Sequence, residues 1–416
     1  MNRRMLLKSA GAVMFASGLG AVPAFLTAAA AQAEPLGRNK ILVAVYQRFG
    51  MDGLFAVTPY GDERLAALRP SLMLSRPGSS ADDARIDLDG QFGLHPSLAP
   101  LEPLYRSSDL AFIHAAGSPD TTRSHSVAAL WWESGAPGDR SVRDGWMARA
   151  AADTPHGASD LHAMAMTDER PRAFYGDTAV TSTGSLDRLL ASTQGDLQSR
   201  IAQLYEATGN PELKNAAVGA EAIRALAAAP ADSAHAARYP RNSAFGDSLR
   251  DIARVIKADV GLRVAFAESR NGANGQGSWD SHSDQASMTG GFAAIADDYA
   301  RSLAAFWADL GDRAEDVVLV NMTDFGRNVP QNDGIGTDHG RATMMMVLGG
   351  GVNGGKVYGQ LPERFERDAL EDQMDLPVTT DYRSVLAAAA GRQLGLDNPQ
   401  SVFPGYSGGQ FEGLIA

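Results

Sequence analysis

Residues 316–328 read DVVLVNMTDFGRN, an apolar run that ends in polar and glycine residues. A short apolar run bounded by turn residues predicts a strand that is buried on both faces. Asp324 and Arg327 follow this strand directly, and an open parallel sheet binds its ligands beyond the carboxyl ends of its strands. The stretch therefore predicts a buried parallel strand over 316–322 and one part of a functional site at its end.

Further apolar runs of the same form alternate with helical patterns along the chain. The other predicted strands are 40–46 (KILVAVY), 110–115 (LAFIHA), 161–166 (LHAMAM) and 344–350 (MMMVLGG). The helical patterns have apolar stripes formed by Leu186, Leu189, Leu190, Leu197, Ile201 and Leu204, by Phe245, Leu249, Ile252 and Ile256, and by Phe292, Ile295, Tyr299, Leu303 and Phe306. This alternation predicts a three-layer α/β/α domain on a mostly parallel sheet, with a helical insertion at about 183–260.

The first 33 residues have the form of an export signal. Arg3 and Arg4 precede an apolar stretch of small residues, and Ala31-Gln32-Ala33 offers a cleavage site. The segment RRMLLK fits the twin-arginine pattern, whereas the alternative is an N-terminal membrane anchor. We expect a twin-arginine signal peptide over 1–33 that is read by the twin-arginine export machinery. We further expect a domain over 34–416 and a periplasmic or secreted protein with no stable membrane span in its mature form.

The charge balance narrows the classes of partner. The chain has 37 basic and 49 acidic side chains, a net charge of −12, and removal of residues 1–33 would leave 34 basic side chains, a net charge of about −15. Such acidity argues against nucleic-acid binding, which needs a basic surface. It does not argue against a small anionic ester, because a metal supplies local positive charge. The absence of cysteine excludes disulfides and cysteine-ligated metal.

Polar residues at the ends of the predicted strands form a candidate metal site. The expected ligands are Asp52, Asp280, His282, Asp324, Asp338 and His339. Carboxylates combined with imidazoles suit zinc, manganese, calcium or magnesium, and we expect one or two such ions. Taken singly, each residue also has a structural explanation: Asp52 as a turn residue, for example, or Asp324 as a helix-capping carboxylate.

The segment after the second strand supplies the candidate catalytic residues. Thr121, Thr122 or Ser124 would be a nucleophile at the start of a helix over 121–132, where backbone N–H groups favour an anion. Arg123 and Arg327 would hold substrate oxygens with bidentate geometry. For His125, a general acid, a metal ligand and a buried structural histidine all remain open.

The order of these residues resembles the alkaline phosphatase superfamily, which includes sulfatases. The resemblance implies that Asp52 and the 120–124 stretch share one metal and that Asp280, His282 and His339 contribute to a two-metal set. Two positions depart from that pattern: Phe325 stands where the superfamily has a histidine, and Asp280 and His282 are separated by one residue instead of three.

Longer segments resemble a twin-arginine-exported family known as domain of unknown function 1501. They are DGLFAVTPYGDERLAALRP, FGLHPSLAPLEPLY, IHAAGSPDTTRSHS, WDSHSDQ, DFGRNVPQNDGIGTDHGRA and LGGGVNGGKVYG. The resemblance implies an alkaline-phosphatase-like fold. We expect an exported metal-dependent hydrolase of phosphate or sulfate esters. The alternative is a non-catalytic periplasmic protein that binds a metal or ligand on the same fold.

Overall fold

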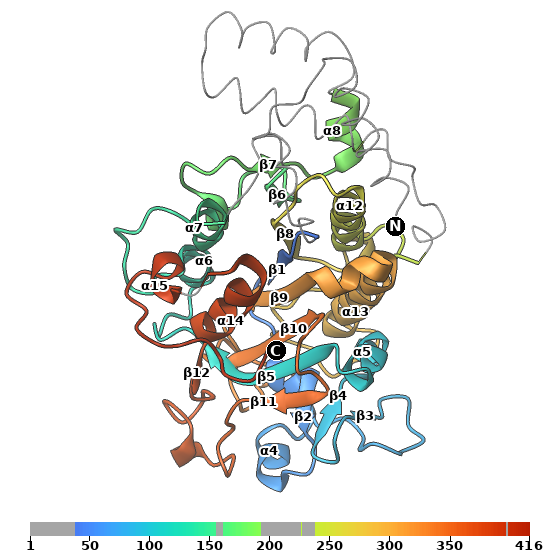
Figure 1. Ribbon diagram of the computed structural model, residues 1–416. Coiled ribbons are helices and arrows are strands. Elements are labelled where there is room, and N and C mark those ends of the chain that lie inside the picture. Colours follow the sequence, from blue (N-terminus) through green and yellow to red (C-terminus); the bar gives the residue numbers. More distant parts are fainter. Residues whose placement is uncertain (1–37, 155–160, 193–225, 227–237, 397) are drawn as a thin grey trace, which may run out of the picture. The chain divides into compact units, whose positions relative to one another are not determined.

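The central element is a nine-stranded sheet in which β10 alone runs against the other strands (Figure 1). The computed structural model describes residues 38–154, 161–192, 226, 238–396 and 398–416, and the sheet belongs to the unit formed by residues 39–416. The strand order is β11 (Lys356–Tyr358), β5 (Leu110–Gly117), β10 (Thr343–Gly349), β9 (Val317–Thr323), β1 (Ile41–Gln47), β8 (Val264–Ser269), β6 (Ala163–Ala165) and β7 (Thr181–Ser182), and β12 (Thr380–Asp381) pairs with β5. The prediction of a mostly parallel sheet is confirmed.

The five predicted strands correspond to β1, β5, β6, β9 and β10. The sequence analysis missed β8, which pairs with β1 in parallel and ends in Glu268 and Ser269. It also missed a small antiparallel sheet with the order β2 (Val57–Pro59), β4 (Phe92–Leu94) and β3 (Ile86–Asp87).

Strand β1 shows why the sheet is covered on both sides. Val43 and Val45 belong to one hydrophobic cluster, and their neighbours Leu42 and Ala44 belong to another. Side chains alternate between the two faces of a strand, so each face of β1 is buried against its own set of helices. The first cluster includes residues of α12 (Ala244–Ala258) and α13 (Gly291–Leu310), and the second includes residues of α6 (His125–Ser134), α7 (Trp146–Ala152) and α14 (Tyr382–Leu394).

The predicted stripes on α12 and α13 are confirmed, because every one of their residues is buried. Asp381 caps α14, and the short helix α15 (Pro399–Val402) follows it. The remaining helices are α3 (Gly53–Ala56), α4 (Glu63–Leu68), α5 (Glu102–Arg106) and α8 (Leu186–Ser192), with 3₁₀ turns η1 (Pro96–Leu101), η2 (Arg172–Phe174), η3 (Ala273–Gly275), η4 (Gly311–Asp316) and η5 (Arg367–Ala369).

Some predictions fall outside the described residues. They are the signal peptide over 1–33 and, within the predicted insertion, the stripe residues Leu197, Ile201 and Leu204. Among the residues that the structure describes, no helix is long and apolar enough to cross a membrane.

Candidate metal centre

Loops from four strands meet at one edge of the central sheet. His125 follows β5, Asp280 and His282 follow β8, and Asp324 follows β9. His339 precedes β10, whose antiparallel direction brings its first residue to the edge where its parallel neighbours end. The topology therefore gathers residues that are up to 214 positions apart, as between His125 and His339.

The Nε2 atoms of His125 and His282 both lie close to the Nε2 atom of His339, beside the carboxylate of Asp280. The Nε2 of His339 lies 3.1 Å from the Nε2 of His125 and 3.1 Å from that of His282. Asp280 Oδ1 lies 2.9 Å from His282 Nε2 and 3.2 Å from His339 Nε2, and Asp280 Oδ2 lies 3.6 Å from His125 Nε2. Ligand atoms of His125, Asp280 and His339 all lie within 4.8 Å of one another.

Each imidazole is fixed through its other nitrogen. His125 Nδ1 lies 2.7 Å from Asp324 Oδ2, and His282 Nδ1 lies 3.0 Å from Asp338 Oδ1. His339 Nδ1 lies 3.0 Å from the carbonyl oxygen of Arg123. All three partners are acceptors, so Nδ1 carries the proton and Nε2 presents a lone pair when the ring is neutral. Metal-binding histidines are held in this way by carboxylates and carbonyls.

Lone pairs at this spacing repel each other unless a metal ion or a proton lies between them. In a tetrahedral site with metal–nitrogen distances of about 2.0–2.1 Å, ligand atoms are about 3.3 Å apart. The observed separations of 2.9–3.6 Å bracket this value. His125, Asp280 and His339 therefore fit as ligands of one divalent ion, and His282, whose Nε2 lies 3.4 Å from Nη1 of Arg327, lies beside them.

The acidic surroundings favour positive charge at this point. Burial disfavours the charged form of His125, but its hydrogen bonds with Asp280 and Asp324 outweigh burial and raise its pKa to about 9. Burial also acts to raise the pKa of Asp280, yet hydrogen bonds with His125 and His339 and the guanidinium of Arg327 hold it well below its usual range. Asp280 is therefore ionised and available as a ligand.

Arg327 holds Asp280. The sequence analysis expected Arg327 to hold substrate oxygens, but its side chain is not placed to do so. Its side chain is fully buried and donates to Asp280 Oδ1, to the carbonyl oxygen of Gly50 at 2.9 Å and to that of Thr337 at 3.2 Å. Arg327 also pairs with His339 in an isolated antiparallel bridge. Gly340 permits this approach, because a Cβ there would lie 2.4 Å from the Arg327 carbonyl carbon.

Two aromatic rings line the centre. Phe325, which stands where the superfamily pattern has a histidine, stacks on His125 with ring centroids 4.7 Å apart and lies 4.7 Å from the ring of His339. Phe49 contacts His125 edge-on at 5.7 Å. Phe49 adopts a φ of 81°, which is uncommon for a bulky residue, and its backbone N–H donates to Asp324 Oδ2 at 3.0 Å. Sequence reasoning missed Phe49, and its position before Gly50 was the only signal.

Asp52 does not present a free carboxylate to the three imidazoles. It is buried and accepts from Arg69 Nη1 at 2.8 Å and from Gln285 Nε2 at 2.8 Å, with Thr337 Oγ1 at 3.3 Å. A buried carboxylate needs a paired charge and hydrogen bonds, and Arg69 and Gln285 supply both. We therefore revise the expected role of Asp52 from metal ligand to ion-pair partner. The sequence gives no signal for Arg69 as that partner.

Asp324 and Asp338 were expected as metal ligands. Both lie at the centre, but their carboxylates bind the Nδ1 atoms of histidines, as described above. The pKa of Asp338 is lowered by hydrogen bonds from Asn332 and His282. Of the six expected ligands, the structure thus brings Asp280, His282 and His339 together and adds His125. Asp324 and Asp338 fix two of these rings.

The candidate nucleophiles lie before helix α6, which begins at His125 and not at 121 as predicted. Thr121 and Ser124 are exposed, and Thr122 is partly buried, with its Oγ1 accepting from the backbone N–H of Ser124 at 3.2 Å. Among the described residues, none of these three hydroxyls hydrogen-bonds to a metal-facing atom of the centre. Arg123 pairs its guanidinium with Asp372 at 3.0 Å and with Asp375, so only its carbonyl faces the centre.

Solved structures show only weak similarity to this chain. Ps i-CgsB in complex with k-i-k-neocarrahexaose has 10% sequence identity and a TM-score of 0.34, over 77% of this chain and 68% of that chain. The PsFucS1 sulfatase from Pseudoalteromonas sp. has 13% identity and a TM-score of 0.33, over 77% and 64%. The integral membrane protein lipooligosaccharide phosphoethanolamine transferase A from Neisseria meningitidis has 13% identity and a TM-score of 0.33, over 85% and 63%. This chain therefore spans less than two thirds of the length of the last two proteins.

Similarity at this level carries no argument about the chemistry of the centre. No curated protein matches the chain. A family model described as a protein of unknown function, DUF1501, matches residues 112–404 and so covers His125, Asp280, His282 and His339. The match spans well over half of the sequence, and the chain belongs to the DUF1501 family.

Proposed function

We propose that the protein is a metal-dependent hydrolase of phosphate or sulfate esters that uses a single divalent ion. The observation that carries this proposal is that ligand atoms of His125, Asp280 and His339 lie within 4.8 Å of one another, beside His282, with the Nδ1 of every ring held by an acceptor. A structural role for histidines does not require two imidazoles and a carboxylate to bring their ligand atoms together.

The donor set favours zinc. Imidazole nitrogens and one carboxylate suit zinc better than magnesium or calcium, which prefer oxygen ligands. This composition is richer in nitrogen than the sequence suggested, because Asp52 and Asp324 bind other side chains and His125 joins the set. When bound, a divalent ion there supplies a Lewis acid that polarises an ester oxygen and lowers the pKa of water.

The protein's own residues would position this chemistry. Asp324, Asp338 and the Arg123 carbonyl hold the three rings, and Arg327 keeps Asp280 ionised and oriented. An anionic ester would lie at the amino end of α6, where the N–H groups after Ser124 face outward and favour negative charge. Ser124, exposed and adjacent to His125, is the best-placed of the three candidate hydroxyls to reach a bound substrate.

The same proposal covers the wider properties expected from the sequence. We propose a three-layer, alkaline-phosphatase-like fold, export by the twin-arginine machinery and a periplasmic or secreted location. The substrate is a small anionic ester and not a nucleic acid, in keeping with the net charge of −12.

A second candidate function is metal or ligand binding without turnover. The specific observation in its favour is that none of the Thr121, Thr122 and Ser124 hydroxyls hydrogen-bonds to the centre within the described residues.

Metal analysis combined with an ester screen separates the two candidates. The mature protein would be analysed for bound metal and assayed with 4-nitrophenyl phosphate and 4-nitrophenyl sulfate in the presence of Zn²⁺, Mn²⁺, Ca²⁺ or Mg²⁺. We expect one equivalent of metal and ester turnover, both lost in His339→Ala and retained in Asp333→Ala, an exposed residue of the same loop. Metal without turnover of either ester would favour the second candidate, and no stable metal binding would overturn both.

A further inference from the structure

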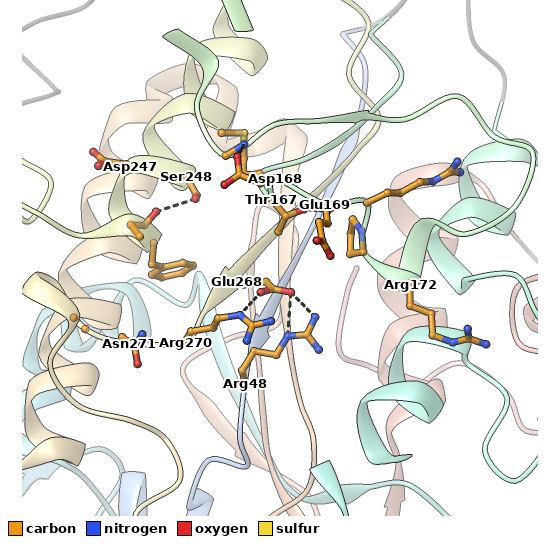
Figure 2. A pocket seen from close by; sticks show the side chains of 18 of the residues that line it. Arg48, Thr167, Asp168, Glu169, Arg172, Asp247, Ser248, Glu268, Arg270 and Asn271 are labelled. Atoms are coloured by element: carbon orange, nitrogen blue, oxygen red, sulfur yellow. Dashed lines mark hydrogen bonds and ion pairs between the residues drawn. The ribbon is translucent and has the colours of Figure 1, made fainter. Parts of the chain in front are cut away.

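A pocket of about 700 Å³ lies at the same edge of the sheet as the metal centre. Its lining includes Arg48 after β1, Thr167 after β6 and Arg270 after β8, together with Glu169 and Glu268, and we call it the Arg48–Arg270 pocket (Figure 2). Its volume is in the range of small-molecule sites, and the carboxyl ends of parallel strands are where such sites form.

Phe49 joins this pocket to the metal centre. The guanidinium of Arg270 lies 5.8 Å from the centroid of the Phe49 ring, and the same ring lies 5.7 Å from the ring of His125. Phe49 also follows Arg48 directly in the chain. One residue with an uncommon backbone conformation thus contacts both a lining residue of the pocket and a ligand of the centre, so the two sites are adjacent.

The floor of the pocket is a fixed chain of paired charges. Arg48 donates to Glu133 at 2.8 Å and to Glu268 Oε1 at 3.0 Å, and Arg270 donates to Glu268 Oε2 at 2.7 Å. Figure 2 shows Arg48, Glu268 and Arg270 lying together on one side of the pocket. The side chains of Arg48, Glu133 and Glu268 are each no more than 13% exposed, so these groups are held rigidly.

The upper part of the pocket offers donors and acceptors that the protein does not use. Glu169 is exposed, and its carboxylate has no hydrogen-bond partner in the described part of the chain. In the described part of the chain, the side-chain amide of Asn271 and the two terminal nitrogens of Arg270 also have no hydrogen-bond partner. Donors and acceptors are therefore interspersed around the opening.

The charges of the lining nearly balance. Four arginines stand against five carboxylates: Arg48, Arg170, Arg172 and Arg270 against Glu133, Asp168, Glu169, Asp247 and Glu268. A polyanion would need a net positive surface, and a hydrophobic ligand would need apolar walls. Closely spaced donors and acceptors of both charges match a ligand with many hydroxyl groups, since each hydroxyl both donates and accepts.

We infer that the Arg48–Arg270 pocket binds the polyhydroxylated, carbohydrate part of a substrate whose ester group lies at the metal centre. This inference rests on the proposed function for the position of the ester. It adds a substrate class, esters of sugars, and a set of residues outside the metal centre that recognises it.

Paired substrates test this inference. The kcat/KM for galactose 6-sulfate and galactose 6-phosphate would be compared with that for hexyl sulfate and hexyl phosphate, which lack the hydroxyls. We expect the sugar ester to be preferred and Glu169→Gln to reduce the preference about tenfold or more, because it removes a charged acceptor from the ligand. Asp177→Asn, an exposed residue outside the lining, is the matched control and should leave the preference unchanged. Equal kcat/KM for sugar and hexyl esters would overturn the inference while the proposed function stands.

Direct binding separates the inference from the proposed function. His339→Ala protein would be titrated calorimetrically with neutral hexasaccharides of glucose, galactose, mannose, xylose and fucose. We expect at least one to bind with a Kd of about 1 mM or lower, and we expect Glu169→Gln to weaken that binding. Sugar binding by this variant, combined with no ester turnover by the wild-type metal-loaded protein, would refute the proposed function alone, and no binding of any hexasaccharide would overturn the inference.

Discussion

Asp338 and Asp333 lie in one exposed loop, but only Asp338 holds a histidine of the centre. Asp338→Ala would free the Nδ1 of His282 and lower metal affinity by about 10- to 100-fold, as loss of such partners does elsewhere. Asp333→Ala removes the same charge without touching His282 and should change affinity little. Competition with a chromophoric chelator measures both, and equal losses in the two variants would show a general charge effect instead.

Asp52 provides a test of the revised role assigned to it. Asp52→Ala would leave the Arg69 guanidinium, which is 2% exposed, without its partner and should lower the free energy of unfolding by about 3–5 kcal/mol. The metal content of the folded protein should stay at its wild-type value. The double variant Asp52→Ala/Arg69→Met should recover part of the stability, because it no longer buries an unpaired charge. Loss of metal with unchanged stability would restore Asp52 as a ligand.

At the scale of residues, the sequence indicated where the site lies but not what each side chain does. Asp324 was expected as a ligand, yet its carboxylate meets Nδ1 of His125. Which atom of a ring faces the metal depends on side-chain direction, and this is set by packing against residues such as Phe325 that are distant in sequence from the ring. A list of carboxylates and histidines does not contain that information.

At the scale of elements, Asp298 on α13 is a buried carboxylate that lacks full compensation. Its Oδ2 accepts from Ser243 at the start of α12 at 3.0 Å, but its Oδ1 has no partner among the described residues. Burial raises its pKa to about 6, against about 3.9 in an unfolded chain. Because the folded pKa is the higher one, the stability linked to the neutral form is present below pH 4 and is lost as the pH rises through 6.

Asp298→Asn should therefore stabilise the α12–α13 pair near neutral pH. We expect the free energy of unfolding at pH 7–8 to rise by roughly 1–3 kcal/mol, and the difference from wild type to vanish below about pH 4. Urea unfolding at several pH values measures this. Asp297→Asn, which removes the exposed partner of Arg301, is the control and should have little effect. A variant that is less stable at every pH would show that the charge is compensated.

Elements with simple patterns were predicted, and elements whose sequence depends on distant partners were not. The largely apolar runs of β1, β9 and β10 were recognised. β8 was missed because VAFAES contains Glu268, and this residue tolerates burial because Arg48 and Arg270 pair with it. The start of α6 was placed four residues early, since the Thr and Ser residues before His125 all suit a helix cap.

At the scale of the whole molecule, the strand order creates the centre. β5 and β10 are neighbours, and β9 and β1 separate β10 from β8, so the loops of β5, β10 and β8 open on one edge of the same part of the sheet. The alternation of strands and helices predicted a parallel sheet, but it does not specify which strands are neighbours. The reversed direction of β10 was likewise not predicted, and it is what brings His339 to the others.

A metal at this position would join three separate loops and so stabilise the folded domain as a whole. Without it, only hydrogen bonds and ion pairs join the side chains of His125, His282, His339 and Asp280. By mass action, free metal at about 1,000 times its Kd should raise the free energy of unfolding by about 4 kcal/mol, which corresponds to several degrees in Tm. We expect chelation followed by dialysis to lower Tm by that amount and re-addition of Zn²⁺ to restore it. His339→Ala should have the low Tm with or without metal. If instead the metal-loaded and metal-free proteins unfold at the same temperature while one equivalent of metal is bound, the ion does not bridge these loops and the assigned ligand set is wrong.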